Sequence, residues 1–445
     1  IPDGCRTQPA AALPGAFRVS GELSLDAARA RDAADPLARW RDEFHFPVSS
    51  RGGSALYLCG NSLGLQPRGA GAEVAKFMAE WQRLGVLGYH DAEADWLNLH
   101  ERLAPTLATL AGASIPEVVA MNSLTLNLHL LMASFYKPTR ERHVILIEHG
   151  AFPSDRYAVV SQIVWHGLDP TESMVQIAPR AGEQLLRHED LLAEIARIGG
   201  RLALVLMPGV QYLTGQLLDL GALAKATHAV GAHVGFDLAH AMGNVPLKLH
   251  DWGADFAVWC SYKYLNGGPG ATAGAFVHER HFDADLPRLA GWWGNDLANR
   301  FDFGTEFRPY AGAAGWQVSN TPLLGMVPLK ASLELFAAAG FPALCARSRE
   351  LTAGLERLLD KQVGKHMEIL TRRDHAAGGA QLSIRLRDTR GNGRALFDAM
   401  LARGLICDWR EPDVIRLAPA PLYNSYEDCW RAVELVGDIL NAARR

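Results

Sequence analysis

The chain has 445 residues, of which 49% are hydrophobic and 21% charged, and its formal net charge at pH 7 is −4. This length allows two or three domains with large buried cores, and the small net charge gives no reason to expect a nucleic acid or an anionic membrane as a partner. No apolar run approaches the roughly 20 residues of a membrane span, and six widely spaced cysteines without a C-x-x-C pair predict free thiols in a reducing cytoplasm.

The N-terminal part of the chain predicts mainly helices. Residues 1–20 are rich in Ala, Pro and Gly, lack the order of a signal peptide and predict a disordered or extended tail. A broken helical period covers 22–45, and a short strand at 56–58 leads into a loop at 59–64. The amphipathic pattern over 69–84 predicts a further helix.

From about residue 117 to 277, short apolar runs alternate with helical patterns. The runs predict strands at 118–121, 143–147, 175–177, 202–207, 233–236, 256–259 and 274–277, with helices at 126–136, 153–165, 188–198 and 217–230 between them. Continuous apolar strands separated by helices predict a mostly parallel sheet that is covered on both faces. Ligands of such sheets bind at the carboxyl ends of the strands.

After about residue 326 the pattern changes. Helices at 326–339 and 342–361 are followed by a strand at 381–386, a helix at 393–403, a strand at 414–417 and a terminal helix at 425–442. We therefore predict a large domain over 83–325 and a smaller α+β domain made of 21–82 together with 326–445.

Lys263 and Asp237 stand at the ends of two predicted strands. Lys263 follows the strand at 256–259 and precedes a glycine-rich turn, and Asp237 directly follows the strand at 233–236. An amine and a carboxylate in these places suit pyridoxal phosphate (PLP), because the amine forms a Schiff base with the aldehyde and the carboxylate keeps the pyridine nitrogen protonated. The alternative for Lys263 taken alone is an ordinary surface lysine.

Several other segments contain candidate ligands. The turn at 122–127 offers backbone N–H groups and hydroxyls that either cradle a phosphate or cap a helix. Phe152 is a candidate to stack on a cofactor ring, or else a core side chain. His240 follows Asp237 by three residues and is a candidate contact of that carboxylate or of the cofactor edge. Four histidines between 228 and 250 lack the spacing of a metal motif, so we predict no metal site.

Arg416 and two loops complete the candidates. The guanidinium of Arg416 either holds an α-carboxylate with two hydrogen bonds or forms a surface ion pair. The loops at 291–294 and 319–322 have unusual aromatic and amide content, and their alternative is simple loop packing.

Found in this order, the segments resemble the kynureninase family, PLP-dependent hydrolases of the fold-type-I aminotransferase superfamily. The resemblance covers nearly the whole chain after about residue 35. Its motifs are GNSLGLQP at 60–67, LTLNLH at 124–129, FPSD at 152–155, GFDLAHA at 235–241, SYKYLN at 261–266 and RLAP at 416–419. It implies an α/β fold of the PLP-dependent transferase type, with a mostly parallel central sheet and a smaller α+β C-terminal domain.

The resemblance also implies roles for individual residues. Lys263 is then the Schiff-base lysine, Asp237 pairs with the pyridinium nitrogen, and Arg416 takes the substrate α-carboxylate. A homodimer with shared sites is implied, because Trp292 and Asn320 would reach the cofactor of the neighbouring subunit. One departure is Pro208, which stands where animal relatives have a serine that contacts the cofactor, and proline has no hydroxyl and no N–H. The remaining cofactor contacts implied are Leu124, Thr125, Phe152, Pro153, Ser154, Asp155, His240 and Tyr262.

The family reaction is the hydrolysis of kynurenine, or of its 3-hydroxy form, to anthranilate or 3-hydroxyanthranilate and alanine, a step of tryptophan catabolism and NAD precursor synthesis. Tyr262 is a candidate general acid, since a phenol beside the cofactor phosphate is well placed for proton transfer. Asn320 and His90 resemble the pair that animal enzymes use around the 3-hydroxyl, which favours 3-hydroxykynurenine. The spacing from His90 to Trp96, however, is one residue short.

Four alternatives compete with this interpretation. An aminotransferase would convert an added 2-oxo acid, and a cysteine desulfurase needs a mobile, exposed cysteine, for which Cys345, Cys407 and Cys429 lie in poor contexts. A non-catalytic PLP-binding protein would keep Lys263 and Asp237 and lose the other site residues. A nicotinamide-dependent oxidoreductase is disfavoured because the chain has no G-x-G-x-x-G fingerprint.

Overall fold

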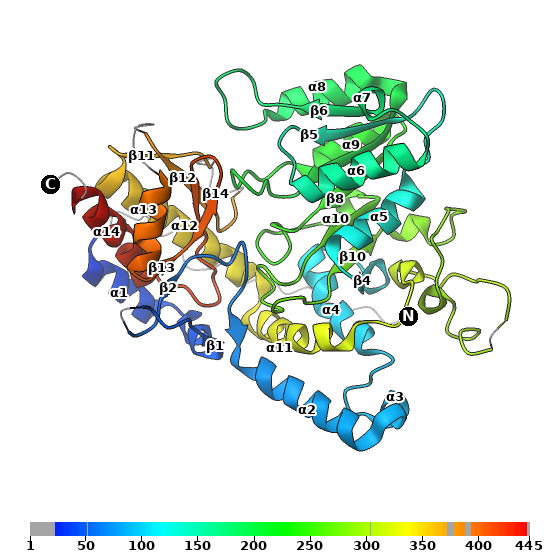
Figure 1. Cartoon of the computed structure of the whole chain (residues 1–445), viewed down its shortest axis with the longest axis horizontal. Helices are drawn as coiled ribbons and strands as arrows, with labels where there is room; N and C mark the ends of the chain where they lie inside the picture. Colours follow the sequence, from blue (N-terminus) through cyan, green and yellow to red (C-terminus); the bar gives the residue numbers. More distant parts are fainter. Residues whose placement is uncertain (1–22, 51, 303, 372–377, 388–392, 443–445) are drawn as a thin grey trace, which may run out of the picture.

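The computed structural model describes residues 23–50, 52–302, 304–371, 378–387 and 393–442 (Figure 1). The predicted tail at 1–20 lies outside these residues. Among the described helices, no single one is long and apolar enough to cross a bilayer, and α11 (Leu323–Ala339) and α12 (Phe341–Val363), bent by 86°, pass such a test only as a pair.

A seven-stranded sheet forms the centre of the larger part of the molecule. The strand order is β4 (Val118–Ala120), β10 (Gly274–Val277), β9 (Phe256–Trp259), β8 (His233–Asp237), β7 (Leu202–Pro208), β5 (Val144–Glu148) and β6 (Met174–Ile177). Only β10 runs antiparallel to its neighbours, and the other pairs are parallel. The prediction of a mostly parallel sheet is confirmed.

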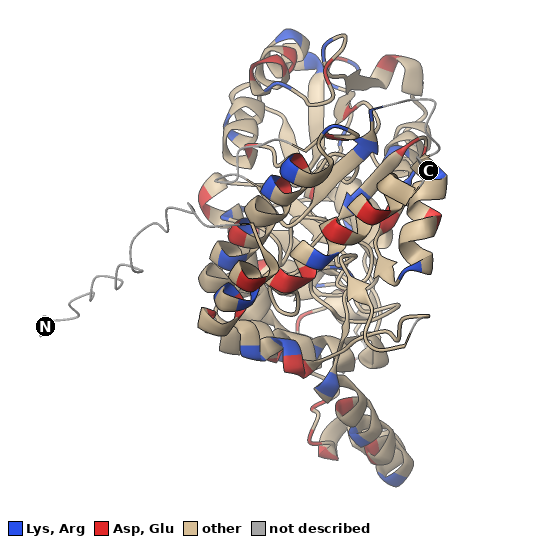
Figure 2. Cartoon of the chain, turned by 90° about the vertical axis from the view of Figure 1, so that its left-hand side faces the viewer, with Lys and Arg blue, Asp and Glu red and all other residues tan. Residues whose placement is uncertain are grey.

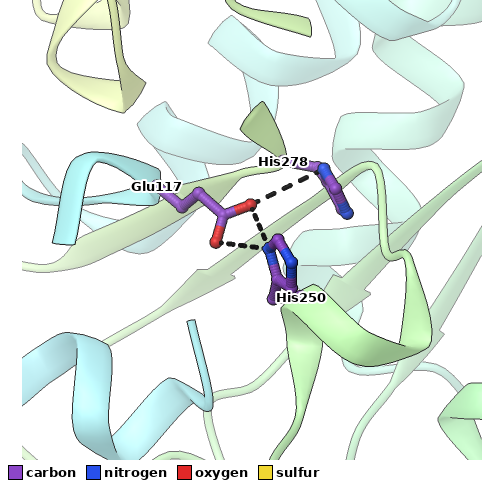
Figure 3. Close-up of side chains that lie close together, drawn as sticks. All are labelled: Glu117, His250 and His278. Carbon is purple, nitrogen blue, oxygen red and sulfur yellow. Dashed lines mark hydrogen bonds and ion pairs between the residues drawn. The ribbon is translucent and has the colours of Figure 1, made fainter. Parts of the chain in front are cut away.

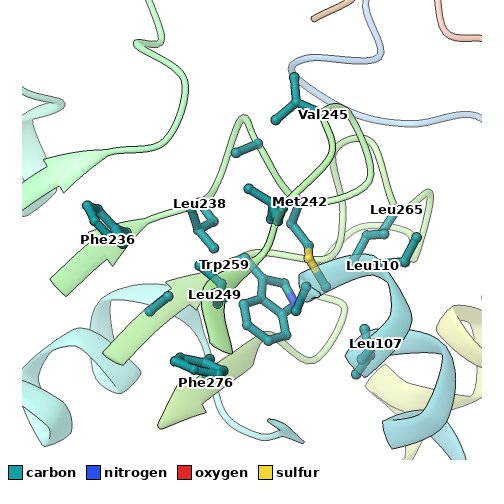
Figure 4. Close-up of a cluster of buried hydrophobic side chains, with 14 of the residues drawn as sticks. Leu107, Leu110, Phe236, Leu238, Met242, Val245, Leu249, Trp259, Leu265 and Phe276 are labelled. Carbon is teal, nitrogen blue, oxygen red and sulfur yellow. The ribbon is translucent and has the colours of Figure 1, made fainter. Parts of the chain in front are cut away.

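Both faces of this sheet are covered, which explains its continuous apolar strands. Alternate residues point to opposite faces, so Trp259 and Phe236 join one core cluster while Val258 and Phe256 join another. Figure 4 shows part of the first cluster, in which Trp259 lies among side chains from the strands, from the loops after them and from α4 (Leu99–Ala111). The second cluster includes side chains of α5 (Leu124–Phe135) and α6 (Pro153–Trp165).

Two further helices belong to the larger part of the molecule. They are α8 (His188–Ile198) and α9 (Leu220–Ala229), which contact each other and follow the predicted alternation of strand and helix. One of them, α9, packs against the central strand β8.

The C-terminal part has its own antiparallel sheet of four strands. Their order is β11 (Met367–Ile369), β12 (Leu382–Leu386), β15 (Val414–Leu417) and β14 (Asp408–Arg410). A separate hydrophobic cluster joins this sheet to α12, α13 (Gly393–Ala402) and α14 (Tyr426–Ala442).

Residues from the N-terminus join this smaller part. Helix α1 (Leu25–Ala34) packs on α14, and β2 (Leu56–Tyr57) pairs with β13 (Leu405–Ile406). Figure 1 shows the blue N-terminal elements beside the orange and red C-terminal ones. The two sheets thus fall within the two predicted domains, while the boundaries themselves remain a prediction.

Helix α2 (Arg68–Leu84), with the short α3 (Gly88–Asp91) at its end, extends away from the body of the chain (Figures 1 and 2). Apolar side chains on this arm are exposed to solvent, among them Trp81 at 54% and Val86 at 76%. Basic and acidic segments lie intermixed over the face drawn in Figure 2. The arm therefore exposes apolar as well as charged side chains.

Candidate active site

The two central strands bring Asp237 and Lys263 to the same end of the large sheet. Asp237 is the last residue of β8 and lies opposite Val258 of β9, and Lys263 follows the end of β9 by four residues. The Nζ atom of Lys263 lies 3.0 Å from Nε2 of His240. Oδ1 of Asp237 accepts a hydrogen bond of 2.7 Å from the N–H of Ala239, which fixes the carboxylate.

A pocket that opens to solvent surrounds these groups. Its walls come from the carboxyl ends of β5, β7 and β8 and from the first turns of α5 and α6. Nine of the predicted site residues line it, namely Leu124, Thr125, Phe152, Ser154, Asp155, Asp237, His240, Tyr262 and Lys263. The structure thus gathers most of the predicted cofactor contacts around one space.

Burial controls the protonation of two groups beside Lys263. His240 is 5% exposed, and burial, with the charge of Lys263 next, holds the pKa of its imidazole well below the ordinary value. A neutral imidazole with an unprotonated Nε2 accepts a hydrogen bond from an ammonium group there. Burial, followed by the neighbouring Asp237, holds the pKa of Asp155 well above its ordinary value.

The unsatisfied polar atoms of the pocket fit PLP. Nδ1 of His240 and Oδ1 of Asp155 are both buried without a hydrogen-bond partner, and an unpaired buried polar atom costs about 1–3 kcal/mol. Helix α5 begins at Leu124, and Ser123 makes no capping hydrogen bond with its side chain. The first-turn N–H groups beside the pocket therefore suit a phosphate.

Tyr262 stands between the pocket and the GNSLG segment. Burial, with Cys260 as the next cause, raises the pKa of its phenol, so the group stays protonated. The carbonyl of Tyr262 accepts a hydrogen bond of 2.8 Å from the N–H of Gly64. A Cβ at Gly64 would lie 2.2 Å from Oδ1 of Asn266 and 2.5 Å from the carbonyl oxygen of Lys263, so only glycine allows this approach.

Arg416 lies beside the pocket and does not line it. Its guanidinium is fully buried. Nη1 donates to the carbonyl of Tyr212 at 2.6 Å, and Nη2 donates to Oγ of Ser62 at 3.1 Å and to Asp408. Tyr212 itself lines the pocket, and its ring meets Phe152 edge-on with centroids 5.3 Å apart.

Four predicted residues lie away from the pocket lining. Pro153 begins α6 behind Phe152, and Trp292 is 46% exposed in its loop. Asn320 donates from Nδ2 to the hydroxyl of Tyr89 at 3.1 Å, whereas the adjacent His90 is exposed on α3. Within the chain, Asn320 therefore contacts Tyr89 rather than His90.

Four lining residues were absent from the predicted set, and a fifth, Pro208, had been set aside because it lacks a hydroxyl. The strongest available signal was that of Glu148, a carboxylate at the end of the apolar strand β5, the same signal that identified Asp237. Burial raises the pKa of Glu148 to about 8, and Nε2 of Gln211 is a hydrogen-bond donor to it at 3.4 Å. Of the other three, Ala239 lies within the GFDLAHA motif, whereas no motif marks Val210 and Tyr212.

The histidines considered for a metal separate in the structure. His228 and His233 lie beside the buried Asp255, and His250 donates to Glu117, whereas His240 lies in the pocket. Figure 3 shows Glu117 between His250 and His278. Glu117 also accepts hydrogen bonds from the N–H groups of Ser114 and Glu279 at 2.9 Å, typical of a structural carboxylate.

Comparisons with known proteins extend this description. Residues 344–436 match the family model of the kynureninase C-terminal domain. Kynureninase from Xanthomonas campestris pv. campestris (strain B100) is 53% identical over 93% of this chain and 97% of its own length. That from Koribacter versatilis (strain Ellin345) is 52% identical over 91% and 95%.

Solved structures share the fold at low identity. The cysteine desulfurase CsdA from Escherichia coli superposes with a TM-score of 0.74 at 18% identity, covering 92% of this chain and 99% of that one. A C-DES variant with glycine covalently linked to its PLP cofactor gives 0.70 at 17% identity, covering 86% and 96%.

This fold, with a lysine and a carboxylate at the strand ends of its sheet, defines a PLP-dependent enzyme of fold type I. PLP is its cofactor, because the kynureninase relatives that match nearly the whole chain belong to a PLP-dependent family. Since relatives more than half identical extend over nearly the entire sequence, the chain belongs to the kynureninase family.

Proposed function

We propose that the protein hydrolyses 3-hydroxy-L-kynurenine, and L-kynurenine less well, to 3-hydroxyanthranilate or anthranilate and L-alanine. The observation that supports this most is the 53% identity to a kynureninase over 93% of the chain. Water supplies a hydroxyl to the carbonyl carbon Cγ and a proton to Cβ as the bond between them breaks. We place the reaction in tryptophan catabolism and NAD precursor synthesis.

Lys263, Asp237 and Phe152 would hold the cofactor, with Lys263 joined to its aldehyde, Asp237 at its pyridine nitrogen and Phe152 against its ring. The first turn of α5, with Leu124 and Thr125, would receive the phosphate. Bound PLP supplies an electron sink for negative charge that develops at the substrate Cα. Pro153, Ser154, Asp155 and His240 complete this set.

Different side chains of the protein act as the base and as the general acid. Lys263 Nζ is the base that removes the proton from Cα. It lies 3.0 Å from Nε2 of His240. Burial lowers the pKa of His240, so its imidazole is neutral and accepts a hydrogen bond from the Lys263 amine. Tyr262 keeps its proton because burial raises the pKa of the phenol, and we assign it as the general acid. Arg416 fixes the α-carboxylate at the small-domain side.

The preference for 3-hydroxykynurenine rests on Asn320 and His90. Oδ1 of Asn320 is buried without a partner, although Nδ2 is engaged by Tyr89. A hydroxyl on the substrate ring would donate to this oxygen, and a site that loses such a partner rejects the analogue that lacks it.

A homodimer with shared sites accounts for the position of Trp292 and Asn320. Neither side chain lines the Lys263 pocket of its own chain. Exposed apolar side chains occur on the arm and in the 289–324 region, including Leu87, Leu289 and Leu324 at 57%, 54% and 49%. Their burial against a second copy would bring the 292 and 320 loops to the neighbouring pocket.

A cysteine desulfurase is the competing function, because the solved neighbours include enzymes of that name. Its chemistry needs an exposed, reactive thiol. The five cysteines in the described part of the chain are all buried. Burial raises the pKa of the Cys345 thiol to about 12, so it carries no thiolate at neutral pH.

The test is to incubate the PLP-loaded protein with each kynurenine and to follow the aryl product by fluorescence and alanine by an enzymatic assay. We expect product from both, with a higher kcat/KM for 3-hydroxykynurenine. Equal or higher kcat/KM for plain kynurenine would reject the preference alone. Absence of product from both, or sulfide release from cysteine, would reject the hydrolase.

A further inference from the structure

A row of polar side chains crosses the inner face of the small-domain sheet. In the ladder, Arg416 of β15 lies opposite Ser383 of β12 on one side and opposite Asp408 of β14 on the other. Arg410 is two residues beyond Asp408 and therefore projects from the same face. This row faces the loop that carries Tyr212, because Arg416 donates to the Tyr212 carbonyl and Ser383 donates to the next carbonyl, that of Leu213, at 2.5 Å.

Arg416 is not a free cation in this row. Its ion pair with Asp408 joins two nearly buried groups, whose side chains are 0% and 9% exposed. Ser62 also donates to the same carboxylate. One guanidinium and one carboxylate in contact have no net charge, so this pair alone has little electrostatic attraction for a second carboxylate.

Arg410 adds the missing charge. Its Nη2 lies 3.2 Å from Oδ2 of Asp408, the oxygen that Arg416 also contacts. Its Nε is buried without a hydrogen-bond partner, while the side chain as a whole is 38% exposed. Two guanidinium groups around one carboxylate have a net charge of +1, which matches one incoming carboxylate.

The charge of Arg410 reaches the Lys263 pocket. After burial, the cations that lower the pKa of His240 are Lys263, Arg416 and Arg410. Burial, with Glu148 next, raises the pKa of Tyr212 on the pocket wall, and the same two arginines oppose this rise. Arg410 itself does not line that pocket and is joined to it through Asp408 and Arg416.

We propose that Arg410 is a positioning residue of the α-carboxylate site, which acts on the substrate through Asp408 and Arg416. In the free enzyme Asp408 is shared by Arg410 and Arg416. When a substrate carboxylate binds to Arg416, Arg410 holds Asp408 and neutralises it. The ligand class is an amino acid with a free α-carboxylate, and the inference depends on the role proposed above for Arg416.

The experiment compares binding of L-alanine and L-alaninamide to the PLP-loaded enzyme by calorimetry, since the amide lacks only the anionic carboxylate. For R410Q we expect the affinity for alanine to fall at least about tenfold, with alaninamide binding unchanged, because one of two nearby positive charges is lost. The KM for kynurenine should rise by a similar factor, with kcat within about twofold.

R410K and R394Q are the matched variants. R410K keeps the charge and should retain most of the alanine preference, which also provides a readout if R410Q loses its fold. Arg394 pairs with Asp398 on the exposed surface of α13 in the same domain, and R394Q should bind both ligands like the wild type.

An unchanged alanine-to-alaninamide ratio in R410Q would overturn the proposal. The proposal would also fail if R410Q lost affinity for alanine and alaninamide equally, or if R410K lost as much affinity for alanine as R410Q does. Each result would indicate that Arg410 acts through structure rather than through its charge. An R416Q variant tests separately whether Arg416 binds the α-carboxylate. If R416Q still binds alanine more tightly than alaninamide, that assignment of Arg416 fails. Kynurenine hydrolysis by the wild type tests the proposed function independently.

Discussion

Glu148 is a carboxylic acid held in surroundings that favour its neutral form. It is 3% exposed, and burial is the main cause that raises its pKa to about 8, with Asp237 as a further cause. Gln211 offers it one long hydrogen bond. In the unfolded chain the same group titrates near pH 4.3. At neutral pH Glu148 is therefore ionised in the unfolded chain and must take up a proton when the chain folds.

The pH dependence of stability should reveal this proton. Because the folded pKa is raised, the stabilisation is fully present below about pH 4.3 and is lost as pH rises through about 8. Between these limits the free energy of unfolding of the cofactor-free wild type should fall, relative to E148Q, by about 1.4 kcal/mol per pH unit. Urea denaturation at pH 6.0 and 7.5 measures it.

E189Q is the control, since Glu189 has a side chain that is 63% exposed. Its stability should follow the wild type at both pH values. If the difference between E148Q and the wild type stays constant from pH 6.0 to 7.5, Glu148 is ionised in the folded protein and its assigned state is wrong.

Tyr262 gives a prediction for catalysis at a single atom. Y262F removes the hydroxyl and keeps the ring, so the general-acid role predicts a kcat lower by about 10²–10³-fold with KM changed little. Steady-state kinetics with 3-hydroxykynurenine checks this, and the PLP content by absorbance serves as its control. A normal kcat with a raised KM would assign the hydroxyl to binding instead.

The predictability of single residues followed the strength of their local signal. Lys263 and Asp237 were recognisable because Asp237 ends one apolar strand and Lys263 follows another by four residues, both at the carboxyl ends of parallel strands. The partners of Arg416 were not, since Ser62 and Asp408 are 354 and 8 residues away in sequence and meet it only through the sheet ladder and the GNSLG segment. Tertiary pairing of that kind leaves no pattern in one sequence.

At the scale of elements, the GNSLG segment packs directly on the turn that carries Lys263. G64A should therefore destabilise the protein by about 1–3 kcal/mol, because the new methyl group would force the two backbones apart. G71A is the matched control: Gly71 lies in α2 with no atom within 4 Å of its would-be Cβ, so alanine should stabilise by up to about 1 kcal/mol. Denaturant unfolding measures the stability of both variants. A G64A protein as stable as the wild type would contradict the close packing.

Strands of the large sheet were predicted almost to the residue, because burial on both faces demands unbroken apolar runs. Helix α4 was missed although Leu99, Leu103 and Leu107 follow a helical period and are buried. Pro105 lies inside it, and proline normally marks a helix end. The short strands β11 and β14 were missed too, since three residues show no reliable alternation.

At the scale of the whole molecule, the arm and the loops at 292 and 320 lie outside the Lys263 pocket of their own chain. Neither Trp292 nor Asn320 lines the pocket, and the arm has exposed apolar side chains at its end. A closed two-fold dimer would bury such surface and exchange loops between the two sites. The proposed shared site therefore predicts how much activity mixed dimers should have.

Heterodimers of K263A and N320A, isolated by two different tags, should recover activity although each homodimer is strongly impaired. If Lys263 and Asn320 of one site come from different subunits, every mixed dimer has one intact site and about half of the wild-type activity. Mixed dimers of K263A and Y262F are the control, because these two residues line one pocket of the same chain and neither site is then intact. Recovery in the control, or none with N320A, would mean that each subunit builds its site alone, and sizing chromatography shows whether dimers form at all.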